Sequence, residues 1–370
     1  MRNIPLSKPT YDEQTKKELL EVLDSGWVGN GGKVLEFEKE FAKHVGARFA
    51  VATNSCTSAL DLCLKVYGIN GGELITTPCT FVSDAIVGEF NGMDVTFADI
   101  DPKTLCIDPE SIELHGNTKA IIAVDSHGRL ANIEMIKAKI DYWNVAPWNP
   151  KIRPLIIEDA AHACYTPDAG KYADITVWSF QAVKTLPIFD GGMITTNDET
   201  IAKKLKALTW LGITKSTYDR VGAKGYSWDY EIDGTGIKAY MTDVQAVIGL
   251  GQLRRLEEMN EKRRYIQNRY NTAFVGHDWF TVPEYSHTVQ YYTPQWKDRD
   301  GLHSYLAEAG ITTSVHFKPL HLMEYWKKAM KRPLPNCEVW KNLLSLPVHD
   351  SMTVSDVNYI IHKVIEFYSK

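Results

Sequence analysis

Two residues able to carry covalent and acid–base chemistry follow two apolar segments of this chain. Lys184 comes six residues after the run Asp174–Trp178, and Asp159 follows Leu155–Ile157 about 25 residues earlier, a spacing that one αβ unit covers. A lysine amine can form a Schiff base with the aldehyde of pyridoxal 5′-phosphate (PLP), and a carboxylate can keep its pyridine nitrogen protonated. The pair therefore indicates amine-transfer chemistry on PLP.

The segments that must position this pair alternate between strand and helix patterns. Continuous β-branched runs separated by helical stretches are typical of an α/β fold with a largely parallel sheet covered on both faces. A parallel sheet binds its ligands at the carboxyl ends of its strands, so residues after these runs should converge on one edge. The predicted strands are 49–52, 74–77, 95–98, 120–124, 155–157, 175–178 and 193–196.

The helical patterns divide the chain into two predicted domains. Apolar residues recur at helical spacing from Val34 to Val45, and a second pattern begins at Ser55. A long pattern, 241–274, leads from a large domain (1–245) into a small α+β domain (246–370). In the small domain we expect helices near 301–309 and 355–368, and a strand near 312–316.

One of these helices begins with residues suited to binding an anion. Ser55–Ser58 opens a helix directly after a strand, and free N–H groups, hydroxyls and the helix dipole at such a position favour a phosphate. Each candidate also has an ordinary explanation when taken alone. Ser55 is a common type of helix cap, Lys184 a common surface residue, and Phe81 a common core residue. Only their conjunction favours a cofactor site.

Composition and charge argue against several other classes of protein. The net charge is −5, with no stripe of Lys or Arg, which argues against a nucleic-acid partner. No apolar stretch reaches the roughly 20 residues needed to cross a bilayer, and the first residues lack the apolar region of a signal peptide. The six cysteines are scattered, without a C-x-x-C pair, which predicts no zinc site and a reduced, cytoplasmic location.

The order of the segments carries a specific resemblance. Val51–Leu60 reads V-A-T-N-S-C-T-S-A-L, similar to a V-x-S-G-T-x-A-L motif, and Ser179–Lys184 reads S-F-Q-A-V-K. Further collinear matches are 77–82, 99–102, 157–163, 190–197, 241–246, 316–321 and 346–347. Together they resemble the DegT/DnrJ/EryC1/StrS family of PLP-dependent sugar aminotransferases. The resemblance spans nearly the whole chain and implies PLP fold type I, whose large domain has a mostly parallel seven-stranded sheet.

The resemblance assigns roles around the cofactor ring. Lys184 would be the Schiff-base lysine, and Asp159 would pair with the pyridine nitrogen. Phe81 would stack on one face of the ring. His162 occupies a position that is often Gln in the family, near the 3-hydroxyl group.

Other positions would bind the cofactor phosphate by the same comparison. Thr57, Ser58 and Ser179 match phosphate-binding positions, and Cys56 lies in the same segment. Lys238 matches a residue that reaches the phosphate of the neighbouring subunit's cofactor. The resemblance therefore implies a homodimer with shared active sites.

Several departures from the family pattern lie near the expected substrate and dimer side. Cys56 stands where Gly is usual, a change that is tolerable if the backbone there is not in a Gly-only conformation. Phe189 also replaces a Gly, Asp125–Gly128 replaces an H-x-Y-G segment, and Ala239-Tyr240 departs from the usual pair. These changes bear on the identity of the substrate before they bear on the cofactor.

The implied activity is transfer of an amino group from glutamate to a nucleotide-linked keto-deoxysugar, a 4-keto-6-deoxyhexose or a 3-keto sugar, in amino-sugar or surface-polysaccharide biosynthesis. Candidate substrate contacts are Trp27, His316, Lys318 and the Gly-rich segment 212–236. Relatives that instead remove a sugar hydroxyl have histidine at the position of Lys184. Two alternatives stay open: an aminotransferase acting on a ketone without a nucleotide, such as a keto-cyclitol, and a non-catalytic sugar-nucleotide-binding homologue.

Overall fold

The computed structural model describes residues 2–145, 153–215 and 230–370. The central part of the predicted segment 212–236 lies outside these residues. At its described ends the chain pairs with itself, because Thr214 N donates to Glu231 O and Asp233 N donates to Gly212 O.

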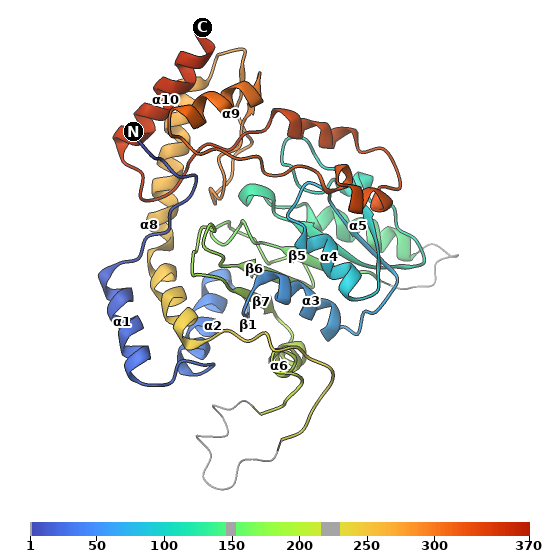
Figure 1. The fold of residues 1–370 in the computed structure, drawn as a ribbon. Helices are drawn as coiled ribbons and strands as arrows, with labels where there is room; N and C mark the ends of the chain where they lie inside the picture. Colours follow the sequence, from blue (N-terminus) through green and yellow to red (C-terminus); the bar gives the residue numbers. More distant parts are fainter. Residues whose placement is uncertain (1, 146–152, 216–229) are drawn as a thin grey trace.

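Among the described residues a seven-stranded sheet forms the centre of the molecule, in the order β1-β7-β6-β5-β4-β2-β3 (Figure 1). β7 runs antiparallel to both of its neighbours, and the other pairs are parallel. The predicted mostly parallel α/β sheet is therefore confirmed. Its strands are β1 (Phe49–Thr53), β2 (Glu73–Thr76), β3 (Asp94–Phe97), β4 (Thr118–Val124), β5 (Leu155–Asp159), β6 (Ile175–Ser179) and β7 (Gly192–Thr196).

Alternate residues of each strand point to opposite faces of the sheet. Both faces are apolar, and helices cover both of them. Val51, Ile157 and Val177 belong to a core shared with α3, α4 and α6. Ala52 and Trp178 belong to another core, shared with α2 and α8. The helices are α1 (Glu13–Asp24), α2 (Gly32–Val45), α3 (Cys56–Val66), α4 (Ser83–Phe90), α5 (Ile133–Asn144), α6 (Glu199–Leu208), α8 (Asp243–Phe274), α9 (Arg299–Glu308) and α10 (Val354–Tyr368).

Local sequence signals explain where these helices begin and end. Gly46 adopts a left-handed conformation (φ 73°) that ends α2. The Ser55 side chain accepts a hydrogen bond from Ser58 N and caps α3. Thr242 and Gln245 form a capping box that starts α8. α8 is continuous across the predicted domain boundary between residues 245 and 246, and that division stays a prediction.

The C-terminal part carries a separate aromatic core, with a two-stranded sheet of β8 (Phe280–Thr281) and β9 (Gln295–Trp296). The predicted strand 312–316 is wrong. Among the described residues, this segment makes one isolated bridge, from Ser314 to Ser345, and Ile311 just before it makes another, to Ile4. The chain turns at His316–Phe317, so the strand cannot continue along its neighbour.

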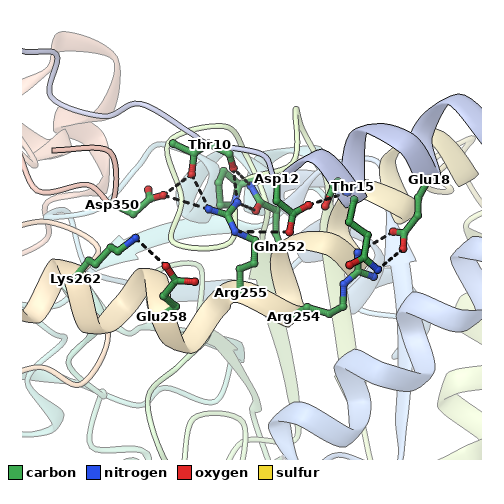
Figure 2. Close-up of polar contacts among 12 residues, drawn as sticks. Thr10, Asp12, Thr15, Glu18, Gln252, Arg254, Arg255, Glu258, Lys262 and Asp350 are labelled. Atoms are coloured by element: carbon green, nitrogen blue, oxygen red, sulfur yellow. Dashed lines mark hydrogen bonds and ion pairs between the residues drawn. The ribbon is translucent and has the colours of Figure 1, made fainter. Parts of the chain in front are cut away.

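A polar cluster ties the N-terminal segment to α8, and we call it the Arg255 cluster (Figure 2). Arg255 Nη1 donates to Thr10 O at 2.9 Å and to Gln252 Oε1 at 3.1 Å. Asp350 and Asp12 lie 3.8 and 4.0 Å from the same guanidinium. Gln252 Nε2 also donates to Pro187 O, three residues after Lys184. The cluster therefore joins four distant segments of the chain.

Within the described ranges, the helices are too short or too polar to span a lipid bilayer.

Candidate active site

The two chemically informative residues follow neighbouring parallel strands. β5 ends at Asp159, β6 ends at Ser179, and Asp159 pairs with Val177 across the two strands. Asp159 is 4% exposed, and its Oδ1 accepts a hydrogen bond from Ala161 N at 2.8 Å. This bond fixes the carboxylate at the edge of the sheet where Lys184 also lies.

Lys184 lies on a turn whose flanks are held by side chains. Its backbone N donates to Gln181 O at 2.8 Å. Gln290 binds both neighbours of the lysine, because its Nε2 donates to Val183 O and its Oε1 accepts from Thr185 Oγ1, each at 2.9 Å. The half-buried lysine is thus placed by a rigid turn.

His162 lies beside Lys184 as a neutral hydrogen-bond donor. Burial, followed by the charge of Lys184, holds the pKa of His162 well below its usual value. Its Nδ1 accepts from the backbone N of His127 at 3.3 Å, so Nε2 carries the proton of the neutral ring. A neutral imidazole N–H replaces the amide N–H that Gln would offer at this position.

Three further aromatic residues enclose His162, and the sequence analysis did not assign any of them a role. Phe317 stacks against its ring with a centroid distance of 6.3 Å, and Tyr291 packs edge-on at 5.3 Å. His127 Nε2 donates to His316 O at 3.1 Å. His316 stacks on Tyr291 at 3.8 Å, and burial followed by the Lys184 charge lowers the pKa of His316 to about 4. These residues form one cluster near Lys184, which we call the histidine wall: His127, His162, Tyr291, His316 and Phe317. The candidate residue His316 therefore belongs to this wall.

The start of α3 has the form of an anion site next to the end of β1. Ser55 Oγ accepts from Ser58 N at 3.1 Å, which leaves the first N–H groups of the helix for a ligand. Cys56 is the first residue of α3 and has no positive φ, so the expected tolerance of a side chain here is confirmed. A Cβ on Gly192 would lie 2.7 Å from Cys56 N, which explains the glycine opposite.

Phe81 is not a core residue. It follows β2 in the turn that leads into α4, and its side chain is 59% exposed. A large aromatic ring presented at the carboxyl edge of the sheet can stack on a planar ligand. The alternative interpretation of Phe81 as core packing is therefore wrong.

Three sequence candidates lie outside this wall. Lys238 is exposed, with Nζ 5.4 Å from the centre of the Trp210 ring and 5.9 Å from that of Tyr240. Trp27 lines a pocket of about 520 Å³ together with Trp210 and Tyr240. Lys318 is exposed beside the His316–Phe317 turn.

Asp84 is a buried acid of this site that the sequence analysis missed. It lies in the first turn of α4 and is 0% exposed. The available signal was an acidic residue inside an apolar helical segment, Val82–Val87, just after a predicted strand.

These residues fit PLP as a set. The first turn of α3 offers N–H groups and hydroxyls for a phosphate, Asp159 a fixed carboxylate, His162 a neutral donor and Lys184 an amine. This donor set matches the phosphate, ring nitrogen, ring hydroxyl and aldehyde of that cofactor.

Comparisons with known proteins agree with the geometry. The spore coat polysaccharide biosynthesis protein SpsC of Bacillus subtilis is 38% identical, covering 98% of this chain and 96% of that protein. The protein Spr1654 of Streptococcus pneumoniae in its PMP form superposes with a TM-score of 0.89 at 28% identity, over 99% of both chains. PseC of Helicobacter pylori, an aminotransferase of pseudoaminic acid biosynthesis, superposes at 0.88 and 25% identity over 100% of both.

Residues 9–365 match the DegT/DnrJ/EryC1/StrS aminotransferase family. This match covers nearly the whole chain, and the relatives align over almost their full length. One edge of the sheet also holds the residues that fit PLP. This chain belongs to the DegT/DnrJ/EryC1/StrS family of PLP-dependent aminotransferases.

Proposed function

We propose that this enzyme uses PLP to move an amino group from glutamate to a nucleotide-linked keto-deoxysugar, a 4-keto-6-deoxyhexose or a 3-keto sugar, for amino-sugar or surface-polysaccharide biosynthesis. The observation that carries the proposal is the placement of Lys184 and Asp159 after neighbouring parallel strands. Relatives named for spore coat polysaccharide and pseudoaminic acid biosynthesis support the sugar substrate.

When bound, PLP supplies an aldehyde for amines and a ring that accepts electrons. Lys184 Nζ holds the cofactor covalently, and Asp159 accepts the hydrogen bond of the pyridine N–H. The first turn of α3, with Cys56, Thr57 and Ser58, binds the phosphate together with Ser179. His162 Nε2 donates to the ring oxygen, and Phe81 stacks on the ring. We propose these roles from the placement of each residue in the site.

Lys184 Nζ also moves the proton that must be transferred between carbon atoms during amine transfer. Once freed from its covalent link, the amine would move a proton between the substrate carbon and the cofactor carbon in each half of the reaction, as general base and then as general acid. The histidines around it do not compete for this role at neutral pH, because burial lowers the pKa of His127, His162 and His316. One amine therefore serves as both base and acid.

We propose that further residues contact the substrate and a partner subunit. His316, Lys318 and Trp27 are proposed sugar or nucleotide contacts. Lys238 is exposed and follows the segment 212–236, and its proposed role is to bind the cofactor phosphate of a second copy. Light scattering of the purified enzyme should therefore give the mass of a dimer, and a monomer would remove the role of Lys238.

Replacement of the lysine tests the proposal directly. Lys184→Ala should abolish amine transfer from glutamate, and Lys184→Arg, which keeps the positive charge, should do the same because it cannot form the covalent link. The visible absorbance band of the wild-type enzyme should disappear on borohydride reduction, and mass spectrometry should locate the adduct on Lys184. Substantial turnover by Lys184→Ala, or an adduct on another lysine, would contradict the assignment.

The same preparation separates the alternatives. Defined ketones, namely nucleotide-linked keto-deoxyhexoses and free keto-cyclitols, are offered to the enzyme with glutamate. Turnover restricted to the cyclitol would replace the nucleotide-sugar substrate. A borohydride-insensitive protein that binds sugar nucleotides without turnover would be the non-catalytic homologue.

A further inference from the structure

Two carboxyl groups are buried against each other beneath the proposed cofactor site. Asp84 and Asp159 are 0% and 4% exposed, and their side chains lie within hydrogen-bonding range of each other. Asp84 Oδ2 accepts from Thr80 Oγ1 at 2.6 Å. Its Oδ1 has no donor among the described residues. An enclosed carboxylate oxygen without a donor, on a group beside a second carboxylate, requires an explanation.

Two neighbouring carboxylates cannot both be ionised in an enclosed site without a large cost, and one of them normally keeps a proton. The groups that face Asp84 are Asp159 from β5, Thr80 from the preceding turn, Cys56 from α3 and Lys184 from the loop after β6. Only Lys184 among them is positive, and it changes the pKa of Asp84 less than Asp159 and Thr80 do. Burial, followed by the charge of Asp159, raises the pKa of Asp84 well above its usual value.

The hydrogen bonds also indicate which oxygen carries the proton. Oδ2 already accepts the Thr80 hydroxyl, whereas Oδ1 is unpartnered and therefore the better position for the acid O–H. A protonated Oδ1 donates to Asp159 and turns the repulsive contact into a hydrogen bond. Asp159 then receives donors from Ala161 N and from Asp84.

We propose that Asp84 is a positioning residue that stays protonated and donates a hydrogen bond from Oδ1 to Asp159, so that Asp159 is the ionised partner of the cofactor's pyridine nitrogen. This inference rests on the proposed PLP site. Asp84 acts through Asp159, and no step of the proposed reaction uses Asp84 directly. It contributes an O–H donor and no negative charge.

Two substitutions separate the donor from the charge. Asp84→Asn keeps the shape, can accept from Thr80 and can donate an amide N–H to Asp159. Asp84→Leu keeps a similar volume but removes the donor. With the holoenzyme as reference, Asp84→Asn should bind PLP within about threefold of wild type and Asp84→Leu at least about tenfold more weakly, as expected for the loss of a hydrogen bond to a charged group. Absorbance titration of each apoenzyme with PLP measures this.

Infrared difference spectroscopy reports the proton itself. The wild-type holoenzyme at neutral pH should show a carbonyl band of a protonated carboxylic acid that is absent from Asp84→Asn. Persistence of every acid band in Asp84→Asn would overturn the proposal. So would equal losses of PLP affinity in Asp84→Asn and Asp84→Leu, because the site would then need a charge at residue 84.

Asp125 offers a matched control on the same sheet edge. It is also 0% exposed, its Oδ2 has no hydrogen-bond partner among the described residues, and it interacts more strongly with Glu158 than with Asp159. Asp125→Asn should therefore lower the affinity for PLP much less than Asp84→Leu does. A loss equal to that of Asp84→Leu would show a general effect of disturbing buried acids and would overturn the specific role of Asp84.

Failure of the proposed function gives a different result. If the wild-type enzyme bound no PLP, the proposed cofactor site would be wrong. The infrared band of Asp84 would still be present, and it would shift in Asp159→Asn. If wild type binds PLP on Lys184 but the Asp84 band is missing, only the present inference fails.

Discussion

The active-site carboxyl pair and the Arg255 cluster use similar groups in opposite arrangements. In the cluster a guanidinium, with its side chain 18% exposed, meets two carboxylates, a carbonyl and a side-chain amide (Figure 2). In the site two carboxyl groups meet each other, and one oxygen lacks a donor among the described residues. Natural proteins depart from local polar satisfaction mainly at functional sites and compensate elsewhere. The comparison indicates that the cluster serves stability and the carboxyl pair serves chemistry.

The largest expected effect comes from removing the charge of Asp159. Asp159→Asn should lower kcat by at least about 100-fold, because an electrostatic partner of the reacting group is lost. The free energy of unfolding of the apoprotein should not fall by more than about 0.5 kcal/mol, because the amide oxygen can still accept from Ala161 N and the cost of a buried charge is removed. Steady-state assays and urea unfolding measure the two quantities.

Asp168→Asn is the matched control for Asp159→Asn. Asp168 is half exposed and pairs with Lys171 at the surface, so both activity and stability should stay near wild type. A large loss of stability in Asp159→Asn with little loss of activity would reverse the assignment of the carboxyl pair to chemistry.

Arg255→Ala should show the opposite pattern. Removal of the guanidinium leaves Gln252 Nε2 as the donor to Thr10 O and the Thr10 hydroxyl as the donor to Asp350. The hydrogen bonds and ion pairs of the charged group are lost, and the free energy of unfolding should fall by about 2 kcal/mol. At a temperature where the variant is folded, kcat should stay within about threefold of wild type. Urea unfolding and steady-state assays again check both.

The same helix supplies the control for this variant. Lys262 pairs with Glu258 at 2.8 Å one turn apart, with both side chains more than half exposed (Figure 2). Lys262→Ala should cost less than about 0.5 kcal/mol. Equal effects of Arg255→Ala and Lys262→Ala would show that the Arg255 cluster has no special role in stability.

The carboxyl pair should also leave a pH signature. Because the pKa of Asp84 is raised in the folded state, the unfolded chain releases a proton above the ordinary carboxyl pKa of about 4. Stability therefore falls as the pH rises from about 4 toward the raised pKa, by up to about 1.4 kcal/mol per pH unit. Asp84→Asn should lack this slope in urea unfolding of the apoprotein, and parallel profiles would show that Asp84 is ionised in both states.

Local patterns in the sequence predicted the residues at the ends of the strands. β-branched runs and helix caps such as Ser55 act over a few residues, and parallel strands bring their carboxyl ends to one edge. The sheet and the placement of Lys184 and Asp159 after neighbouring strands could therefore be predicted. The family resemblance supplied the fold type, and the match over residues 9–365 confirms it.

The rest of the site depends on contacts between distant segments. His127 meets His316 across 189 positions, and Tyr291 stacks on the same histidine. No local pattern reports such packing. No role could be assigned to Asp84, because that role depends on contact with Asp159. The two residues lie close together only after β2 and β5 enter the same sheet. The predicted strand 312–316 was wrong for the same reason, because its β-branched residues lack a continuous partner.

The histidine wall sharpens the comparison, because its effect on stability has the opposite sign to that of Asp84. The pKa of His316 falls to about 4 in the folded state, whereas an unfolded histidine titrates near 6.5. Unfolding therefore takes up a proton between these values, and stability falls as the pH drops from about 6.5 to about 4, by up to about 1.4 kcal/mol per pH unit.

His316→Phe keeps a ring against Tyr291 and removes the titration. Its loss of the hydrogen bond to Ser345 Oγ shifts stability by an amount that does not depend on pH, so the slope between pH 6.5 and 4 isolates the imidazole. Urea unfolding of apoprotein at several pH values should give a shallower acid decline for His316→Phe than for wild type. An equally steep decline would mean that His316 takes up its proton while the wall is still folded, and the wall would then carry a positive charge beside Lys184 in mildly acidic solution.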